Sequence, residues 1–195
     1  MSSSQDSGTR DPGSQDRGSQ EPSQDDYLDR LRRRVLWKMP TGLYLLGSAA
    51  GDRRNLMTLN LAIQVALSPK LVGVSVEVHA HTHELIREGG VFALSILKRE
   101  DRTVVRKFVK PVEASDIEVD ENDQTTMRGV AVRSDKTGAP ILAGAAAWLD
   151  CRVTNEVPSR SHTFFIGEVV GFGFSDGGEE AEVLRMEDTR MNYGG

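Results

Sequence analysis

The sequence predicts a mainly β domain with a few inserted helices, arranged as a small barrel. Three observations predict this fold. Apolar and polar residues alternate over most of the chain after Thr41, the helical stretches are short, and two long alternating segments lie near the end. The regular succession of strands and helices that is typical of a parallel sheet is absent. With 195 residues, of which 38% are hydrophobic, we expect one domain, over residues 27–195.

Residues 1–26 have the composition of a disordered acidic tail. The triplet Ser-Gln-acid recurs four times, and no large apolar residue follows Met1, so burial cannot offset the entropy of ordering. Six acids and two arginines give this segment a charge of −4, while the whole chain carries −5. The remainder is nearly neutral. Proteins that bind nucleic acid carry a basic surplus, so we expect no nucleic-acid partner.

Two further features bear on location. No apolar run approaches the eighteen or so residues of a membrane span, and the basic-then-apolar order of a signal peptide is missing, so we expect a cytoplasmic protein without membrane association. Cys151 is the only cysteine, which rules out an intramolecular disulfide. Because Cys151 lies in the alternating run AWLDCRV, we expect a small buried side chain rather than a reactive thiol.

The first elements follow the tail. Leu28, Leu31 and Val35 share one face of a predicted helix, which Pro40 ends. GLYLLGSA then predicts a strand, and GDRRN predicts its turn.

Two alternating segments come next. NLMTLNLAIQVAL is interpreted as one strand in which the odd positions 57 to 67 face the core and the even ones form a polar shelf, although a helical stripe also fits it. LVGVSVEV predicts a strand with Val72, Val74, Val76 and Val78 on one face.

The middle of the chain mixes helices and strands. HTHELIREGG predicts a short helix with Leu85 and Ile86 inward and Gly89 or Gly90 as its C-terminal cap. VFALSIL predicts a strand. REDRTVVRKFVKP predicts a helix ended by Pro111, with Val104, Val105 and Phe108 as its buried stripe. Short strands are expected over residues 115–119 and 126–133.

The two long segments, ILAGAAAWLDCRV and HTFFIGEVVGFGF, are joined by TNEVPSRS. This connection has the length of a hairpin loop, so we expect the two strands to pair antiparallel. The total is seven or eight strands with two or three helices.

Three stretches are candidates for binding or chemistry. In DRRNLMTLN, Arg53, Arg54 and Asn55 offer charge and amides to an anionic ligand, and Thr58 and Asn60 offer hydrogen bonds; an ordinary charged turn is the alternative. In HAHTHELI, a phosphate at the helix start would meet free N–H groups, with Thr82 and one of His79, His81 or His83 beside it. Solvated histidines, or a metal site, are the alternatives there.

The third stretch is SRSHTFFIGEV, where His162 begins a strand at the barrel rim or is a simple turn residue. The sequence contains none of the nucleotide-binding or hydrolase motifs GxGxxG, GxxxxGK[ST] and GxSxG. If the protein is an enzyme, a cofactor therefore supplies the chemistry.

The order of these segments resembles the flavin reductase-like family, which has an FMN-binding split-barrel fold. The resemblance covers residues 36–193 and rests on NLMTLN, SPKLVGVSVE, HTHELIREGGVFALSIL, Phe108, GAPILAGAAAWLDCRV and SHTFFIGEVVGFGF. It implies an intertwined homodimer that binds FMN, with FAD as the alternative flavin, and NADH or NADPH as co-substrate. The chain departs from the common family pattern at Asn60 and at Ala80-His81.

The resemblance also implies roles for residues. The segment Asn55, Leu56, Met57 and Thr58 would lie along the isoalloxazine edge, the segment Ala80, His81 and Thr82 would meet the phosphate, and His162 would lie near the flavin or the nicotinamide. The implied activity is an NAD(P)H-dependent flavin reductase, with a monooxygenase as the partner that takes the reduced flavin. Two other readings stay open: a flavin-binding electron-transfer protein without nicotinamide turnover, and a non-enzymatic barrel that binds metal or haem.

Overall fold

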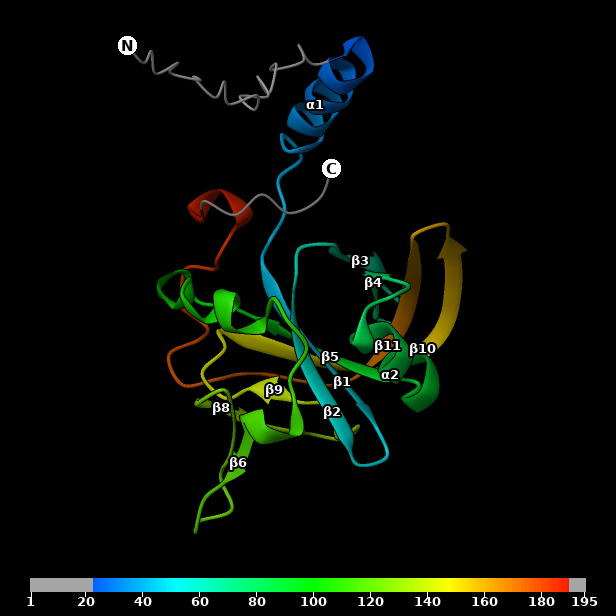
Figure 1. Cartoon of the computed structure of the whole chain (residues 1–195). Coiled ribbons are helices and arrows are strands. Elements are labelled where there is room, and N and C mark those ends of the chain that lie inside the picture. Colours follow the sequence, from blue (N-terminus) through cyan, green and yellow to red (C-terminus); the bar gives the residue numbers. More distant parts are fainter. Residues whose placement is uncertain (1–22, 190–195) are drawn as a thin grey trace, which may run out of the picture.

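The computed structural model describes residues 23–189, and within them the fold is mainly β (Figure 1). Eleven strands in this range form two sheets in which every pair is antiparallel. The larger sheet has the order β2-β1-β5-β10-β11-β4-β3 and the smaller one β6-β7-β8-β9. The hydrogen-bonded strands of the larger sheet do not close into a ring, and β2 and β3 are its edge strands.

The strands of the larger sheet are β1 (Tyr44–Ala50), β2 (Arg53–Leu59), β3 (Ala62–Ala66), β4 (Leu71–Glu77), β5 (Val91–Ile96), β10 (Ala147–Ser159) and β11 (His162–Phe174). Those of the smaller sheet are β6 (Ile117–Val119), β7 (Thr125–Met127), β8 (Val130–Arg133) and β9 (Ile141–Leu142). The α-helices are α1 (Gln24–Leu36) and α2 (His81–Gly89), and the 3-10 helices are η1 (Arg99–Asp101), η2 (Val104–Phe108), η3 (Ala114–Asp116) and η4 (Met186–Asp188).

Two main apolar clusters hold these elements together. One, around Leu45, Phe108 and Leu142, joins β1 to η2 and to the smaller sheet. The other, around Val74, Phe92 and Phe165, joins the strands of the larger sheet to α2 through Ile86. Cys151 belongs to this second cluster and is fully buried, and burial raises the pKa of its thiol to about 12. The expectation of a small buried side chain at Cys151 is confirmed.

Several predicted elements are confirmed. The strand over LVGVSVEV is β4, with Val72, Val74 and Val76 buried, and VFALSIL forms β5. Helix α2 has Leu85 and Ile86 buried and ends at Gly90, whose φ of 66° is the left-handed conformation of a glycine cap. The two long strands β10 and β11 pair antiparallel, but the loop expected over TNEVPSRS is wrong because the strand runs on to Ser159 and turns at Arg160-Ser161.

The single strand predicted over NLMTLNLAIQVAL is wrong. The chain breaks at Asn60-Leu61 into two strands, which lie at opposite edges of the sheet. In β2, Leu56 and Thr58 are buried, because β2 is covered by η2 on the face that was expected to be a polar shelf. In β3, the odd positions are exposed rather than in the core, with Ile63 at 62%.

Two other predictions need correction. The helix expected over REDRTVVRKFVKP is two short 3-10 helices, although Val105 and Phe108 are buried as predicted. The strand expected over residues 126–133 is two strands, because Arg128 and Gly129 both adopt positive φ and turn the chain.

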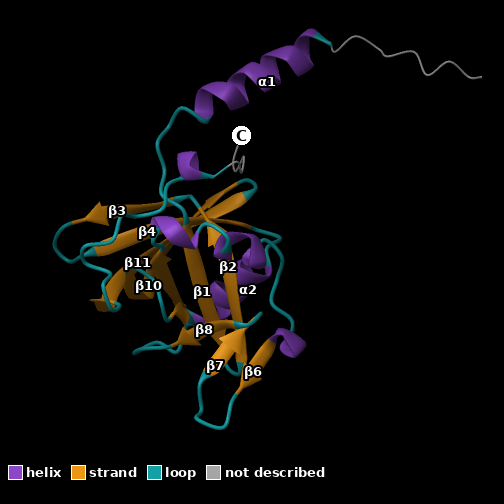
Figure 2. Cartoon of the chain, turned by 90° about the vertical axis from the view of Figure 1, so that its left-hand side faces the viewer, coloured by secondary structure: helices purple, strands orange, loops and turns teal. Residues whose placement is uncertain are grey.

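Helix α1 begins at Gln24, inside the segment expected to be a tail, and the predicted tail over residues 1–22 lies outside the described residues. Both views show α1 standing away from the sheets (Figures 1 and 2). None of its residues is buried, so its predicted apolar face, with Leu28, Leu31 and Val35, is exposed. In the part of the chain that the structure describes, no helix is both long and apolar enough to cross a membrane.

Candidate functional site

The structure brings the three candidate stretches together around the first turn of α2. Strand β2 is joined to α2 by a buried hydrogen bond of 2.6 Å, in which Asn55 Nδ2 donates to Thr82 Oγ1. The start of β11 lies beside the segment that precedes α2, because His162 pairs with Glu77 and the Val78 amide donates to the Ser161 carbonyl at 2.9 Å.

The first turn of α2 presents free backbone amides. The amides of His83 and Glu84 both donate to the carbonyl of Ala80, the residue at the N-cap. Ala80 has no side-chain hydrogen bond with which to cap the helix. Helix geometry therefore leaves the N–H groups of His81 and Thr82 for another acceptor, and the helix dipole favours an anion there. The turn is chemically suited to an anion, and the phosphate site expected here stays a prediction.

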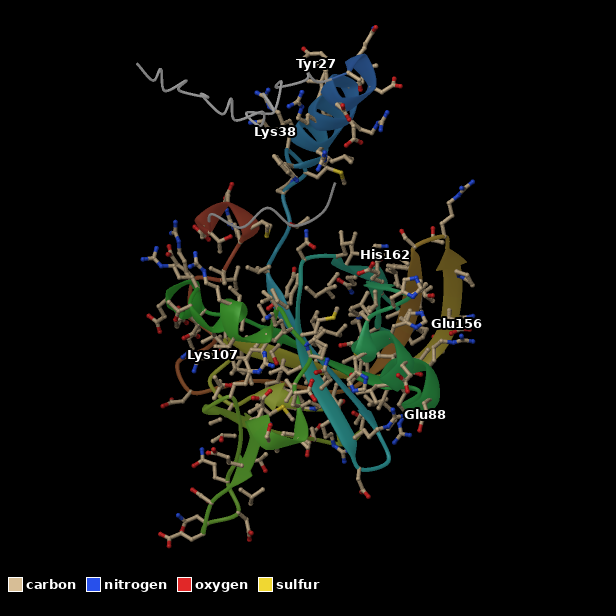
Figure 3. The ribbon with its side chains drawn as sticks, in the orientation of Figure 1. Tyr27, Lys38, Glu88, Lys107, Glu156 and His162 are labelled. Carbon is tan, nitrogen blue, oxygen red and sulfur yellow. The ribbon has the colours of Figure 1, made fainter. Side chains whose placement is uncertain are left out.

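A cavity of about 800 Å³ lies at this turn, between α2 and the β10–β11 hairpin. Figure 3 shows Glu88 of α2 and Glu156 of β10 on the same side of the molecule, with His162 near the end of the hairpin. The volume of this cavity is within the range of cavities that bind cofactors. The lining residues are Val78, His79, Ala80, His81, His83, Glu84, Arg87, Glu88, Glu156, Pro158 and Thr163.

The two arginines of the opening motif are engaged by the protein. Arg53 forms ion pairs with Glu84, at 2.8 Å, and with Glu88. The hydrogen bond from Arg53 lowers the pKa of Glu84, so the glutamate stays charged near neutral pH. Arg54 donates to the carbonyls of Gly51 and Arg53, at 2.5 and 2.9 Å, and so stabilises its own turn. The expectation that these arginines face an anionic ligand stays a prediction, and both side chains already have acceptors within the protein.

The polar residues expected to contact the ligand are mostly buried. Thr58 Oγ1 donates to the Val105 carbonyl at 2.6 Å, and Thr82 is fully buried on Asn55. Asn60 is 8% exposed. The predicted shelf of exposed polar side chains along β2 is therefore absent among the described residues, and Leu56 and Met57 pack with the apolar clusters. What β2 offers a ligand is its edge, where backbone groups have no strand partner.

The histidines occupy different environments. His83 is buried, with Nε2 at 2.8 Å from Thr163 Oγ1 and its ring 5.2 Å from that of Phe165. Burial lowers the pKa of His83, so it is neutral at pH 7. His81 Nδ1 lies 3.8 Å from Glu84, and His162 Nδ1 lies 3.0 Å from Ser161 Oγ. Within residues 23–189, no three side chains of metal-ligand type are grouped.

Sequence reasoning missed the contribution of the hairpin. Glu156, Pro158 and Thr163 line the cavity, but the first two lie where a loop was expected. Thr163 follows His162, and only the pairing of β11 with β4 brings it beside His83. On α2, the helical spacing of Glu84, Arg87 and Glu88 was the available signal, since these positions share the face next to the one that buries Leu85.

Comparison with known proteins identifies the family of the chain. The model of the flavin reductase like domain matches residues 36–194. An NADH-dependent FAD reductase of Streptomyces globisporus is 32% identical over 146 residues, which cover 74% of this chain and 76% of that protein.

Two solved structures are similar in fold. The NADH:FAD oxidoreductase of Streptomyces globisporus, in complex with NAD and FAD fragments, has a TM-score of 0.65 at 28% identity and covers 85% of this chain and 91% of its own. The styrene monooxygenase flavin reductase of Pseudomonas putida S12 has a TM-score of 0.64 at 27% identity. The match covers 78% of this chain and 90% of that one. The predicted resemblance is confirmed: the chain belongs to the flavin reductase-like family.

Proposed function

We propose that the protein is an NAD(P)H-dependent flavin reductase. The observation that carries this proposal is the uncapped start of α2, which borders a large cavity and is joined to the edge strand β2 by the hydrogen bond between Asn55 and Thr82. The free amides fit the phosphate of FMN, or the diphosphate of FAD, and the strand edge fits the polar rim of an isoalloxazine. Family membership and the NADH-dependent relative support the same activity.

Different residues would bind the phosphate, the flavin ring and the nicotinamide. The amides of His81 and Thr82 would hold the phosphate, because Arg53 is already balanced by Glu84 and Glu88. When bound, the flavin supplies a ring nitrogen that accepts a hydride from C4 of the nicotinamide. Backbone groups of β2, from Asn55 to Thr58, would orient the ring, and His162 at the hairpin would position the nicotinamide. No acid or base of the protein is required for the transfer.

The assay for this proposal follows nicotinamide absorbance on mixing the purified protein with FMN or FAD and with NADH or NADPH. We expect oxidation that depends on both added flavin and protein. Flavin binding without nicotinamide oxidation would instead indicate an electron carrier. Absence of flavin binding would contradict the proposal as a whole. Oxygen consumption stimulated by a flavin-dependent monooxygenase would identify the class of partner, as the name of the styrene monooxygenase reductase suggests.

The proposed assembly is a homodimer of split barrels in the cytoplasm, where reduced nicotinamide is available. It is supported by apolar side chains that one chain leaves exposed on β3, on the turn after it and on the end of β11, among them Ile63 at 62%, Leu67 at 72% and Phe172 at 74%. A second copy that covers these side chains would remove their contact with water.

This assembly is tested with Ile63→Asp. We expect light scattering to give the molar mass of a dimer for the native chain and mainly that of a monomer for the variant. An unpaired carboxylate at an apolar interface is costly. Val119→Asp is the matched control, since Val119 on β6 is 63% exposed and lies in the other sheet. Dissociation by both substitutions, or by neither, would contradict the proposed interface.

A further inference from the structure

Arg128 holds together a loop that lies beside the site. Its guanidinium donates to the carbonyls of Lys107, Lys110 and Pro111, at 2.5, 3.2 and 2.6 Å, and pairs with Asp116 at 2.9 Å. The fork of donors on arginine suits this set of acceptors, which a lysine could satisfy only in part.

The backbone of Arg128 adopts an unfavourable conformation, which its side-chain contacts stabilise. Arg128 has a φ of 52°, in the left-handed region that disfavours most side chains, and its amide donates to the Asp116 carbonyl at 2.7 Å. The contacts of the guanidinium offset that cost. The loop it holds, residues 107–111, includes the last two residues of η2 and leads directly into Val112.

Val112 transmits this position to the site through two buried hydrogen bonds. The Val112 amide donates to Asn55 Oδ1 at 2.8 Å, and Asn55 Nδ2 donates to Thr82 Oγ1 at 2.6 Å. Asn55 is 1% exposed and Thr82 is fully buried, so water cannot replace either partner without rearrangement. Both functions of the Asn55 amide are used, one toward the loop and one toward α2.

Thr82 is the second residue of α2 and lies between His81 and His83, both of which line the cavity, and helix geometry leaves its amide without a partner inside the helix. Its side chain therefore fixes the turn that the proposed function assigns to the phosphate. A shift of this turn by a fraction of a hydrogen-bond length would misalign both donors.

We propose that Arg128 is a positioning residue for the flavin site, acting through the loop at residues 107–111, Val112 and the Asn55–Thr82 hydrogen bond on the first turn of α2. The inference rests on the proposed function, because it assigns the turn to the flavin phosphate. Arg128 itself would touch no ligand.

The test measures FMN affinity, by quenching of flavin fluorescence, in Arg128→Ala and Arg128→Lys. We expect the dissociation constant for FMN to rise about tenfold in Arg128→Ala, the scale of one lost buried hydrogen bond, and less in Arg128→Lys. At saturating flavin, kcat should stay near that of the native protein, because the misplaced group binds rather than reacts.

Arg99→Ala is the matched control. Arg99 also joins separate segments through two carboxylates, Glu182 at 3.0 Å and Asp188 at 2.8 Å, but these lie on the C-terminal segment. We expect a comparable loss of thermal stability and no change in FMN affinity. Equal FMN affinities in Arg128→Ala and Arg99→Ala would overturn the proposal.

A second pair of variants tests the same relay if Arg128→Ala does not fold. Thr82→Val keeps the shape of the side chain but removes the acceptor for Asn55, whereas Thr82→Ser keeps the hydroxyl. We expect weakened FMN binding in Thr82→Val and near-native binding in Thr82→Ser. Native affinity in Thr82→Val would refute the relay. A native chain that binds no FMN would instead contradict the proposed function, so the two failures are distinguishable.

Discussion

Ala80→Asp is expected to weaken FMN binding by at least about tenfold relative to Ala80→Asn, while the two variants bind riboflavin equally. Ala80 is the N-cap of α2 and lines the cavity, so a side chain placed there faces the proposed phosphate position. Aspartate and asparagine have nearly the same shape and cap helices about equally well. The two variants therefore differ in one charge, and riboflavin differs from FMN in the phosphate that this charge would repel.

The stability of the two variants provides the internal control. Either side chain can accept from the free amides of the first turn, so each variant should gain about 0.5–1 kcal/mol in free energy of unfolding over the native chain. The difference in FMN affinity should shrink as salt is added, because exposed charges are screened. Similar FMN dissociation constants for Ala80→Asp and Ala80→Asn would show that the phosphate does not bind at the start of α2.

The start of α2 could be predicted from sequence because its signals are local. The Leu85-Ile86 pair, the glycines that follow, and the preceding run of valines all lie within about twenty residues of one another, and the structure confirms each. The side-chain partners could not be predicted in this way. Asn55 and Thr82 are both short polar residues, which usually indicates exposure, and their hydrogen bond spans 27 positions in the chain.

The error at β2 and β3 has the same origin. The alternation in NLMTLNLAIQVAL is real, but alternation does not say which face is covered. Packing of η2 buries the Thr58 side of β2, while β3 has only β4 as a neighbour and leaves Ile63 exposed. If a second copy covers β3, the odd positions face a core between chains, which a single-chain interpretation cannot locate.

Gly89→Ala is expected to lower the free energy of unfolding by about 3 kcal/mol or more. This is at the upper end of the usual destabilisation caused by adding a methyl group to a well-packed interior. A Cβ on Gly89 would lie 1.8 Å from the carbonyl oxygen of Ala49 and 2.9 Å from its carbonyl carbon. Both are backbone atoms of a central strand, so neither can rotate away. Helix α2 would have to move off β1, and the cavity at its first turn would move with it.

The neighbouring Gly90→Ala separates this steric effect from backbone conformation. Gly90 has a φ of 66°, but a Cβ there would meet nothing within 4 Å. Its cost should be about 1 kcal/mol, the cost of a left-handed alanine, without displacement of α2. Guanidinium unfolding of both variants and FMN titration of whichever fraction folds would measure this. Gly89→Ala should lose stability and FMN affinity together, whereas Gly90→Ala should lose only stability. Equal unfolding midpoints for the two variants would show that α2 is not held against β1 as closely as Gly89 and Ala49 indicate, and the rigid first turn that the flavin site requires would lose its support.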